Sequence, residues 1–99
     1  MTIVKELNDK QLTIKLEGEL NTTTAPLLEE VIKSDLNGIS SLVFDLEKLE
    51  YLSSAGLRML LVAQKIMDQQ GKMVIRHANK NILEVFDITG FSSILDIEN

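Results

Sequence analysis

Apolar and polar residues alternate one by one near the amino terminus of the chain. In residues 11–17, QLTIKLE, the apolar side chains fall on one side of an extended chain and the polar ones on the other. This period of two predicts a half-buried strand. Residues 2–8 predict a weaker strand, and the turn-forming residues 8–10 should join the two into a hairpin. Gly18 is expected to end the second strand.

The period changes to that of a helix in the next segment. Between residues 27 and 36 the apolar positions recur at spacings of three and four, with charged residues on the opposite side. Asn21 or one of the threonines 22–24 can cap this helix, and Asn37-Gly38 should close it.

A nearly unbroken apolar run follows in residues 41–46, SLVFDL. Such a run predicts a strand buried on both faces, at the centre of a sheet covered by helices. Residues 47–53 are expected to form the loop that leaves this strand. From Leu57 the helical period returns, so a second helix should run to Gln70, and Gly71 should stop it.

The last third of the chain continues the alternation of strand and helix. Residues 72–77 predict a short strand, Asn79 can cap a third helix, and Gly90 should end that helix. Residues 94–97 form either a short edge strand or a docked tail. The predicted order is β-β-α-β-α-β-α(-β), an α/β fold with one mixed sheet of four to five strands and helices packed on it. Right-handed crossovers make the strands of its β-α-β units parallel.

The length and charge of the chain narrow the classes of function. Its 99 residues suffice for one compact domain, residues 1–99, built on one core. The net charge of -5 argues against a nucleic-acid-binding protein, which needs a basic face to neutralise phosphates. The lack of cysteine excludes disulfides and thiolate metal sites.

Targeting and cofactor signals are missing from the sequence as well. There is no P-loop, dinucleotide fingerprint or metal-ligand cluster, so we expect no cofactor and no metal. The first residues, charged from Lys5 onward, do not resemble a signal peptide. The apolar block at residues 59–63 is far shorter than the roughly 20 residues of a membrane span. We therefore expect a soluble, cytoplasmic protein.

The segment LEYLSSAGLRMLL, residues 49–61, holds the candidate chemistry. Ser54 is expected at or beside the N-cap of the second helix, with Ser53 before it and small residues after it. One interpretation is a capped helix whose Gly56 permits close packing on the sheet. The other is a modification site, because unsatisfied N–H groups and the positive end of the helix dipole favour a phosphate there.

A hydrolase is the weaker interpretation of the same serine. The G-x-S-x-G pattern is absent, since Leu52 stands two residues before Ser54. The only histidine, His77, ends another predicted strand, and nothing in the spacing selects Asp45 or Asp87 to orient it. We therefore assign no catalytic residue and do not expect an enzyme.

Two linked motifs resemble those of STAS domains, and specifically of bacterial anti-sigma factor antagonists. Residues 51–58, Tyr-Leu-Ser-Ser-Ala-Gly-Leu-Arg, are similar to the family's phosphorylatable loop, aromatic–aliphatic–Asp–Ser–Ser/Thr–Gly–Leu–Gly. Residues 18–21, Gly-Glu-Leu-Asn, followed by Thr24-Ala25, resemble the family's Gly-Glu-Leu/Ile-Asp-x-x-Thr-Ala. The strand of residues 42–46, with Asp45, is similar as well. The predicted order of elements is that of the STAS fold.

The resemblance implies a switch between binding partners. In this family the unphosphorylated protein, a monomer when free, binds an anti-sigma factor that is also a GHKL-type serine kinase, and the sigma factor is released. The kinase then phosphorylates the antagonist, and a PP2C-type phosphatase resets it. Ser54 aligns with the phosphorylated serine, and Ser53 is the alternative. The implied partner-binding residues lie in the two motifs, which we expect side by side at one end of the sheet: Asn21, Thr24, Ser53, Ser54, Ala55, Gly56 and Arg58.

Three positions depart from the family pattern. Ser53 and Asn21 stand where the family has aspartates, and Arg58 stands where it has glycine. These changes make the loop less acidic and place a positive charge within a turn of Ser54. The alternative function is a STAS scaffold that is not phosphorylated, as a subunit of a transporter or of a signalling complex.

Overall fold

A computed structural model describes residues 1–98 of the chain. The elements follow the predicted order, including the final strand: β1 (Thr2–Asn8), β2 (Gln11–Leu20), α1 (Ala25–Asp35), β3 (Ser41–Leu52), α2 (Ser54–Asp68), β4 (Lys72–Arg76), α3 (Lys80–Thr89), a 3-10 turn (Phe91–Ser93) and β5 (Ile97–Glu98). None of the helices in this range has the length and apolar character needed to cross a membrane.

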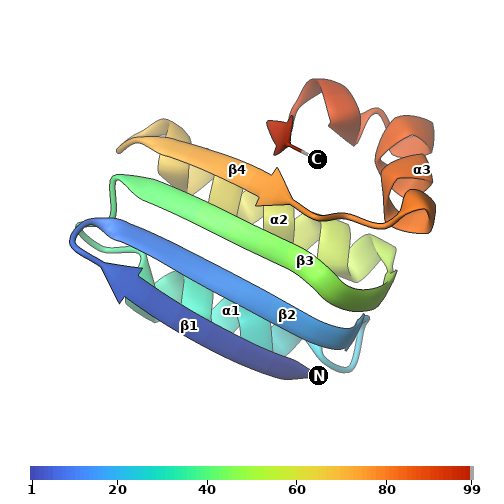
Figure 1. The fold of residues 1–99 in the computed structure, drawn as a ribbon, viewed down its shortest axis with the longest axis horizontal. Helices are drawn as coiled ribbons and strands as arrows, with labels where there is room; N and C mark the ends of the chain where they lie inside the picture. The colour runs from blue at the N-terminus through green and yellow to red at the C-terminus, as the bar shows by residue number, and fades with distance from the viewer. Residues whose placement is uncertain (99) are drawn as a thin grey trace.

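The five strands form one mixed sheet in the order β1-β2-β3-β4-β5. β1 is antiparallel to β2, and all other neighbours are parallel. Figure 1 shows α1 and α2 on one face of this sheet, while α3 lies beyond the carboxyl end of β4. The carboxyl ends of β2 and β3 meet at the same edge (Figure 1), which is where the loops of a parallel sheet carry sites.

The core lies between the sheet and the two helices behind it. Alternate residues of β2 point into it, and the register places Ile14 of β2 beside Phe44 of β3. Leu28 of α1, together with Leu60 and Met67 of α2, is fully buried on the same side. The period-two faces of the strands and the period-3.6 stripes of the helices therefore meet in one apolar layer. The central position of β3 confirms the prediction from its continuous apolar run.

The predicted loop at residues 47–53 is wrong, because β3 continues to Leu52. The ladder between β2 and β3 has register shifts at two places, where β3 carries more residues than its partner. A bulge of this kind turns the side chains that follow it toward the other face of the sheet. The buried residues of β3 therefore change from a spacing of two to a spacing of three, at Leu46, Leu49 and Leu52.

Gly18 does not end β2, which runs on to Leu20. Its φ of +101° belongs to the second irregular step of the ladder, where glycine adopts a backbone that other residues avoid. The predicted end of α2 is also two residues too long, since Asp68 is its last residue.

The signals around α3 are confirmed. Oδ1 of Asn79 accepts the backbone N–H of Ile82 at 2.9 Å, and Gly90 ends the helix with a φ of +80°. The tail combines both expected forms: Leu95 is buried, and β5 pairs with the end of β4.

Candidate functional site

Ser53 and Ser54 have different roles at the start of α2. Ser53 is the N-cap, and its Oγ accepts the backbone N–H of Gly56 at a long 3.4 Å. Ser54 is the first residue of the helix and is exposed to solvent. Within residues 1–98 its hydroxyl makes no hydrogen bond to another group. The structure thus places Ser54 beside the N-cap and gives the capping role to its neighbour.

The two motif loops lie side by side, as the sequence predicts. The backbone N–H of Ser53 donates to the carbonyl of Leu20 at 2.9 Å, and Leu20 pairs with Leu52 at the end of the β2–β3 ladder. This hydrogen bond fixes the start of α2 against the end of β2. A protein that contacts one loop at this edge therefore meets the other as well.

Asn21 and Thr24 build the turn between β2 and α1. Oδ1 of Asn21 accepts the backbone N–H groups of Thr23 at 3.0 Å and Thr24 at 3.1 Å. Oγ1 of Thr24 accepts the N–H of Asn21 at 2.9 Å and donates to the carbonyl of Glu19 at 2.8 Å. Both side chains hold the shape of the loop. These hydrogen bonds therefore position the backbone between β2 and α1.

The small residues after the serines serve the packing of α2 on the sheet. A Cβ on Gly56 would lie 2.6 Å from Cδ1 of Leu52 and 2.7 Å from Cγ of Leu20. Gly56 is buried and Ala55 half-buried, whereas Arg58 is exposed. The packing interpretation of Gly56 therefore has a direct structural basis, and it does not conflict with a modification at Ser54.

The charges around Ser54 are suited to an anion. The first turn of α2 has no acidic side chain, so the positive end of its dipole is not neutralised from within the helix. Arg58 lies four residues after Ser54, a spacing that places the two side chains on the same helix face. A phosphate on the Ser54 hydroxyl would meet a favourable field on both counts.

Helix α3 lines a hollow beside the end of β3, and this hollow was not apparent in the sequence. An open hollow of about 280 Å³ lies between the end of β3 and the first turns of α3, and it is lined by Glu50, Tyr51, Leu52, Asn81, Ile82 and Val85. Tyr51 is 52% exposed there. The hydrogen bond from Nδ2 of Asn79 to the carbonyl of Leu49, at 3.1 Å, holds α3 against this end of β3. No local pattern links residues 30 positions apart, so the hollow could be found only from the fold.

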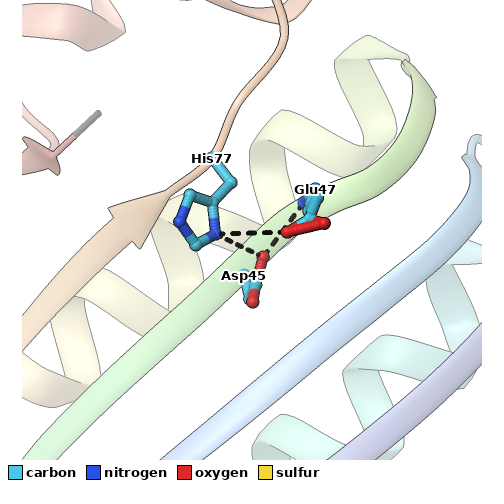
Figure 2. Close-up of side chains that lie close together, drawn as sticks. All are labelled: Asp45, Glu47 and His77. Atoms are coloured by element: carbon cyan, nitrogen blue, oxygen red, sulfur yellow. Dashed lines mark hydrogen bonds and ion pairs between the residues drawn. The ribbon is translucent and has the colours of Figure 1, made fainter.

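The single histidine lies in a different cluster. Nδ1 of His77 is 3.0 Å from Oδ1 of Asp45 and 3.9 Å from Oε2 of Glu47 (Figure 2). Partial burial would raise the pKa of Asp45, but hydrogen bonds from His77 and from the N–H of Glu47 outweigh it and hold that pKa below its usual value. Within the part of the chain that the structure describes, neither Ser53 nor Ser54 is hydrogen-bonded to His77. The imidazole is oriented by a carboxylate, but it does not activate a serine.

Comparison with known proteins agrees with this fold and with the motifs. The model of the STAS domain family matches residues 2–99. The chain belongs to the STAS domain family. BtrV of Bordetella bronchiseptica, provisionally named an anti-sigma factor antagonist, is 37% identical over 101 residues, covering 100% of the chain and 87% of BtrV. The anti-sigma-B factor antagonist of Listeria monocytogenes is 31% identical over 99 residues, covering 97% of the chain and 86% of that protein.

Solved structures share the STAS fold of this chain. An anti-sigma factor antagonist from Mycobacterium paratuberculosis superposes with a TM-score of 0.88 at 24% identity, over 97% of this chain and 83% of that one. SpoIIAA in its unphosphorylated form superposes with a TM-score of 0.79 at 15% identity, over 99% and 88% of the two chains. At these identities the likeness establishes the fold and leaves the site to be argued from its own residues.

Proposed function

We propose that this STAS domain is an anti-sigma factor antagonist, a binding protein rather than an enzyme, that acts in the cytoplasm. Its unphosphorylated form would bind a GHKL-type serine kinase that is also the anti-sigma factor, and so release the sigma factor. Two relatives that are named anti-sigma factor antagonists match this chain over 87% and 86% of their own length, and these matches support the assignment. The observation that carries the switch is the exposed hydroxyl of Ser54, left without a partner because Ser53 caps the helix.

Ser54 is the better of the two candidate phosphorylation sites. A phosphate on Ser53 would sacrifice the hydrogen bond that its Oγ accepts from Gly56, and a lost cap costs about 1 kcal/mol. A phosphate on Ser54 keeps that cap and adds a dianion at the positive end of α2. Arg58, in place of the family's glycine, would then compensate part of the new charge within the protein.

The switch needs no change of fold. The partner would cover the loop that contains Ser53 and Ser54, the adjoining loop of Asn21 and Thr24, and the exposed side chain of Arg58. A dianion in the middle of such an interface brings repulsion and a desolvation cost, and both weaken binding. A PP2C-type phosphatase would restore the binding form.

Mass spectrometry of the protein from its native cells tests the modification. Trypsin cleaves after Lys48 and Arg58 and releases residues 49–58 with both serines, and fragment ions then separate Ser53 from Ser54. We expect phosphate on Ser54 in a fraction that changes with growth condition. Phosphate on Ser53 alone would keep the switch but refute our choice of residue.

Binding to a purified GHKL-type kinase from the same genome tests the partner. Ser54→Asp should weaken capture of the kinase, whereas Ser54→Ala should retain it. Ser92→Asp places the same charge on an exposed serine away from the loop and serves as the matched control. Equal capture by all variants, with no phosphate in any condition, would favour the scaffold function over the switch.

A further inference from the structure

A second cluster of polar side chains lies where β3 and β4 run side by side (Figure 2). Asp45 and Glu47 belong to β3, and His77 follows directly after the last residue of β4. One carboxylate oxygen of each acidic residue and one imidazole nitrogen all lie within 4.8 Å of one another. The function proposed above uses none of these three side chains.

The spacing of the donor atoms suits three ligands of one small cation. Nδ1 of His77 lies 3.0 Å from Oδ1 of Asp45 and 3.9 Å from Oε2 of Glu47. Two ligands about 2.1 Å from a tetrahedral Zn²⁺ ion lie about 3.4 Å apart, between these two values. A proton on Nδ1 can serve only Asp45, because 3.9 Å is too long for a hydrogen bond. A cation in its place would contact both carboxylates.

Asp45 is largely buried in the cluster, whereas His77 and Glu47 are exposed to solvent. Only 19% of the Asp45 side chain is exposed, and its Oδ1 also accepts the backbone N–H of Glu47 at 3.0 Å. The side chains of His77 and Glu47 are 52% and 67% exposed, so they can adjust to an ion that arrives from solvent. The carboxylates also border an open hollow of about 320 Å³ lined by residues of β1, β2 and β3, which gives water a way to the site.

The lysines that line this hollow lie beside carboxylates outside the proposed ligand set. Lys15 lines the same hollow, and its Nζ lies 3.0 Å from Oε2 of Glu6. This hydrogen bond from Lys15 to Glu6 raises the pKa of the lysine and keeps its charge directed toward β1. Lys48 also lines the hollow, and its Nζ lies 4.0 Å from Oε2 of Glu17. The lining therefore carries the negative charges of Glu17, Asp45 and Glu47 against the positive charges of Lys15 and Lys48, so the hollow remains favourable for a divalent cation.

We infer that Asp45, Glu47 and His77 form a binding site for a divalent transition metal ion of the Zn²⁺ type. One imidazole nitrogen with two carboxylate oxygens suits such an ion better than Mg²⁺, which prefers oxygen ligands alone. Three protein ligands leave one position for water or for a group from a partner protein. The site lies on β3 and just after β4 and is separate from the Ser54 loop that begins α2.

Titration of the full, untagged chain with ZnCl₂ tests the site by NMR. The chain has one histidine and no cysteine, so the imidazole signals report on His77 alone and no thiolate competes. We expect Zn²⁺ to shift these signals together with the amides of Asp45 and Glu47. The same concentration of MgCl₂ should leave the imidazole signals in place. Imidazole signals that do not move with Zn²⁺, or that move equally with Mg²⁺, would overturn the inference.

Calorimetry of variants then tests the ligand set. His77→Gln and Asp45→Asn should each weaken Zn²⁺ binding by at least about ten-fold, and Glu30→Gln on α1 removes an exposed carboxylate elsewhere as the matched control. If Asp45→Asn does not fold, Glu47→Gln at an exposed position supplies the second ligand test. Unchanged affinity in His77→Gln, or an equal loss in Glu30→Gln, would contradict the assignment.

Discussion

Replacing Gly56 by alanine tests whether the packing of α2 on the sheet decides the residue at this position. On an open helix surface the change would stabilise the protein by about 1 kcal/mol, because alanine has the higher helix propensity. Here the added Cβ would lie 2.6 Å from Leu52 and 2.7 Å from Leu20, whereas carbon atoms prefer about 3.5–4.0 Å. Both leucines are buried, at 4% and 0% exposure, so neither can turn toward solvent.

The two effects of Gly56→Ala can be compared directly. Overpacking of a core costs about 1–3 kcal/mol, and the gain in helix propensity offsets only part of that cost. We expect a net loss of about 1 kcal/mol in the free energy of unfolding. For a domain of this size the melting temperature should then fall by about 4–8 °C.

Urea and thermal unfolding of four proteins would measure this effect: the parent, Gly56→Ala, Leu20→Ala and the double variant. Leu20→Ala removes one of the two side chains that the new methyl group would meet and leaves the contact with Leu52, so the loss caused by Gly56→Ala should become smaller in that background. A Gly56→Ala protein that is more stable than the parent, with the same increment in both backgrounds, would refute the packing argument.

Three further substitutions follow from contacts described above. Asn79→Ala removes the cap of α3 and its hydrogen bond to β3, so urea denaturation should report a loss of about 1–2 kcal/mol; a loss below about 0.5 kcal/mol would contradict this role. Gly71→Ala would place a Cβ against the backbone carbonyl of Ser40, which cannot rotate away, so its loss in the same assay should exceed that of Gly56→Ala. Because its pKa is lowered in the folded state, Asp45 contributes stability above the ordinary aspartate pKa of about 3.9, and this contribution disappears as pH falls through the folded value. The stability difference between the parent and Asp45→Asn should therefore shrink below about pH 4 in thermal unfolding, and a constant difference down to pH 2 would argue against the interaction.

Local sequence patterns predicted an element correctly where the residues of that element alone determine it. The alternation in β2, the apolar run in β3 and the cap at Asn79 each gave the correct element, because burial and capping act within a few residues. They were insufficient at Gly18 and in residues 47–53. There the chain stays extended because β3 keeps its pairing with β2 across two bulges, both of them in β3, and neither strand alone carries that information.

One candidate site could be recognised from the sequence, and the other became apparent only in the structure. The pair Ser53 and Ser54 was recognisable from its position before a helix. Which of the two serines caps the helix can be determined only from the backbone geometry of the structure. In the cluster of Asp45, Glu47 and His77, the histidine lies about 30 positions from the carboxylates, and no local pattern associates them. A usable signal exists in the sequence: Asp45 lies near the end of the apolar run 41–46 and His77 at the end of the predicted strand 72–77, and consecutive parallel strands are often neighbours.

The order of strands across the sheet is the same as their order along the chain. No strand has to enter between two that are already paired, so the sheet can grow from one edge to the other while the polypeptide leaves the ribosome. The hairpin of β1 and β2 supplies the first edge, and each following helix and strand extends the structure from its last partner. The two-residue β5 is the last strand to leave the ribosome. The residues of the two proposed binding loops, 21–24 and 53–58, all precede β4 in the chain, so they leave the ribosome before β4 and β5.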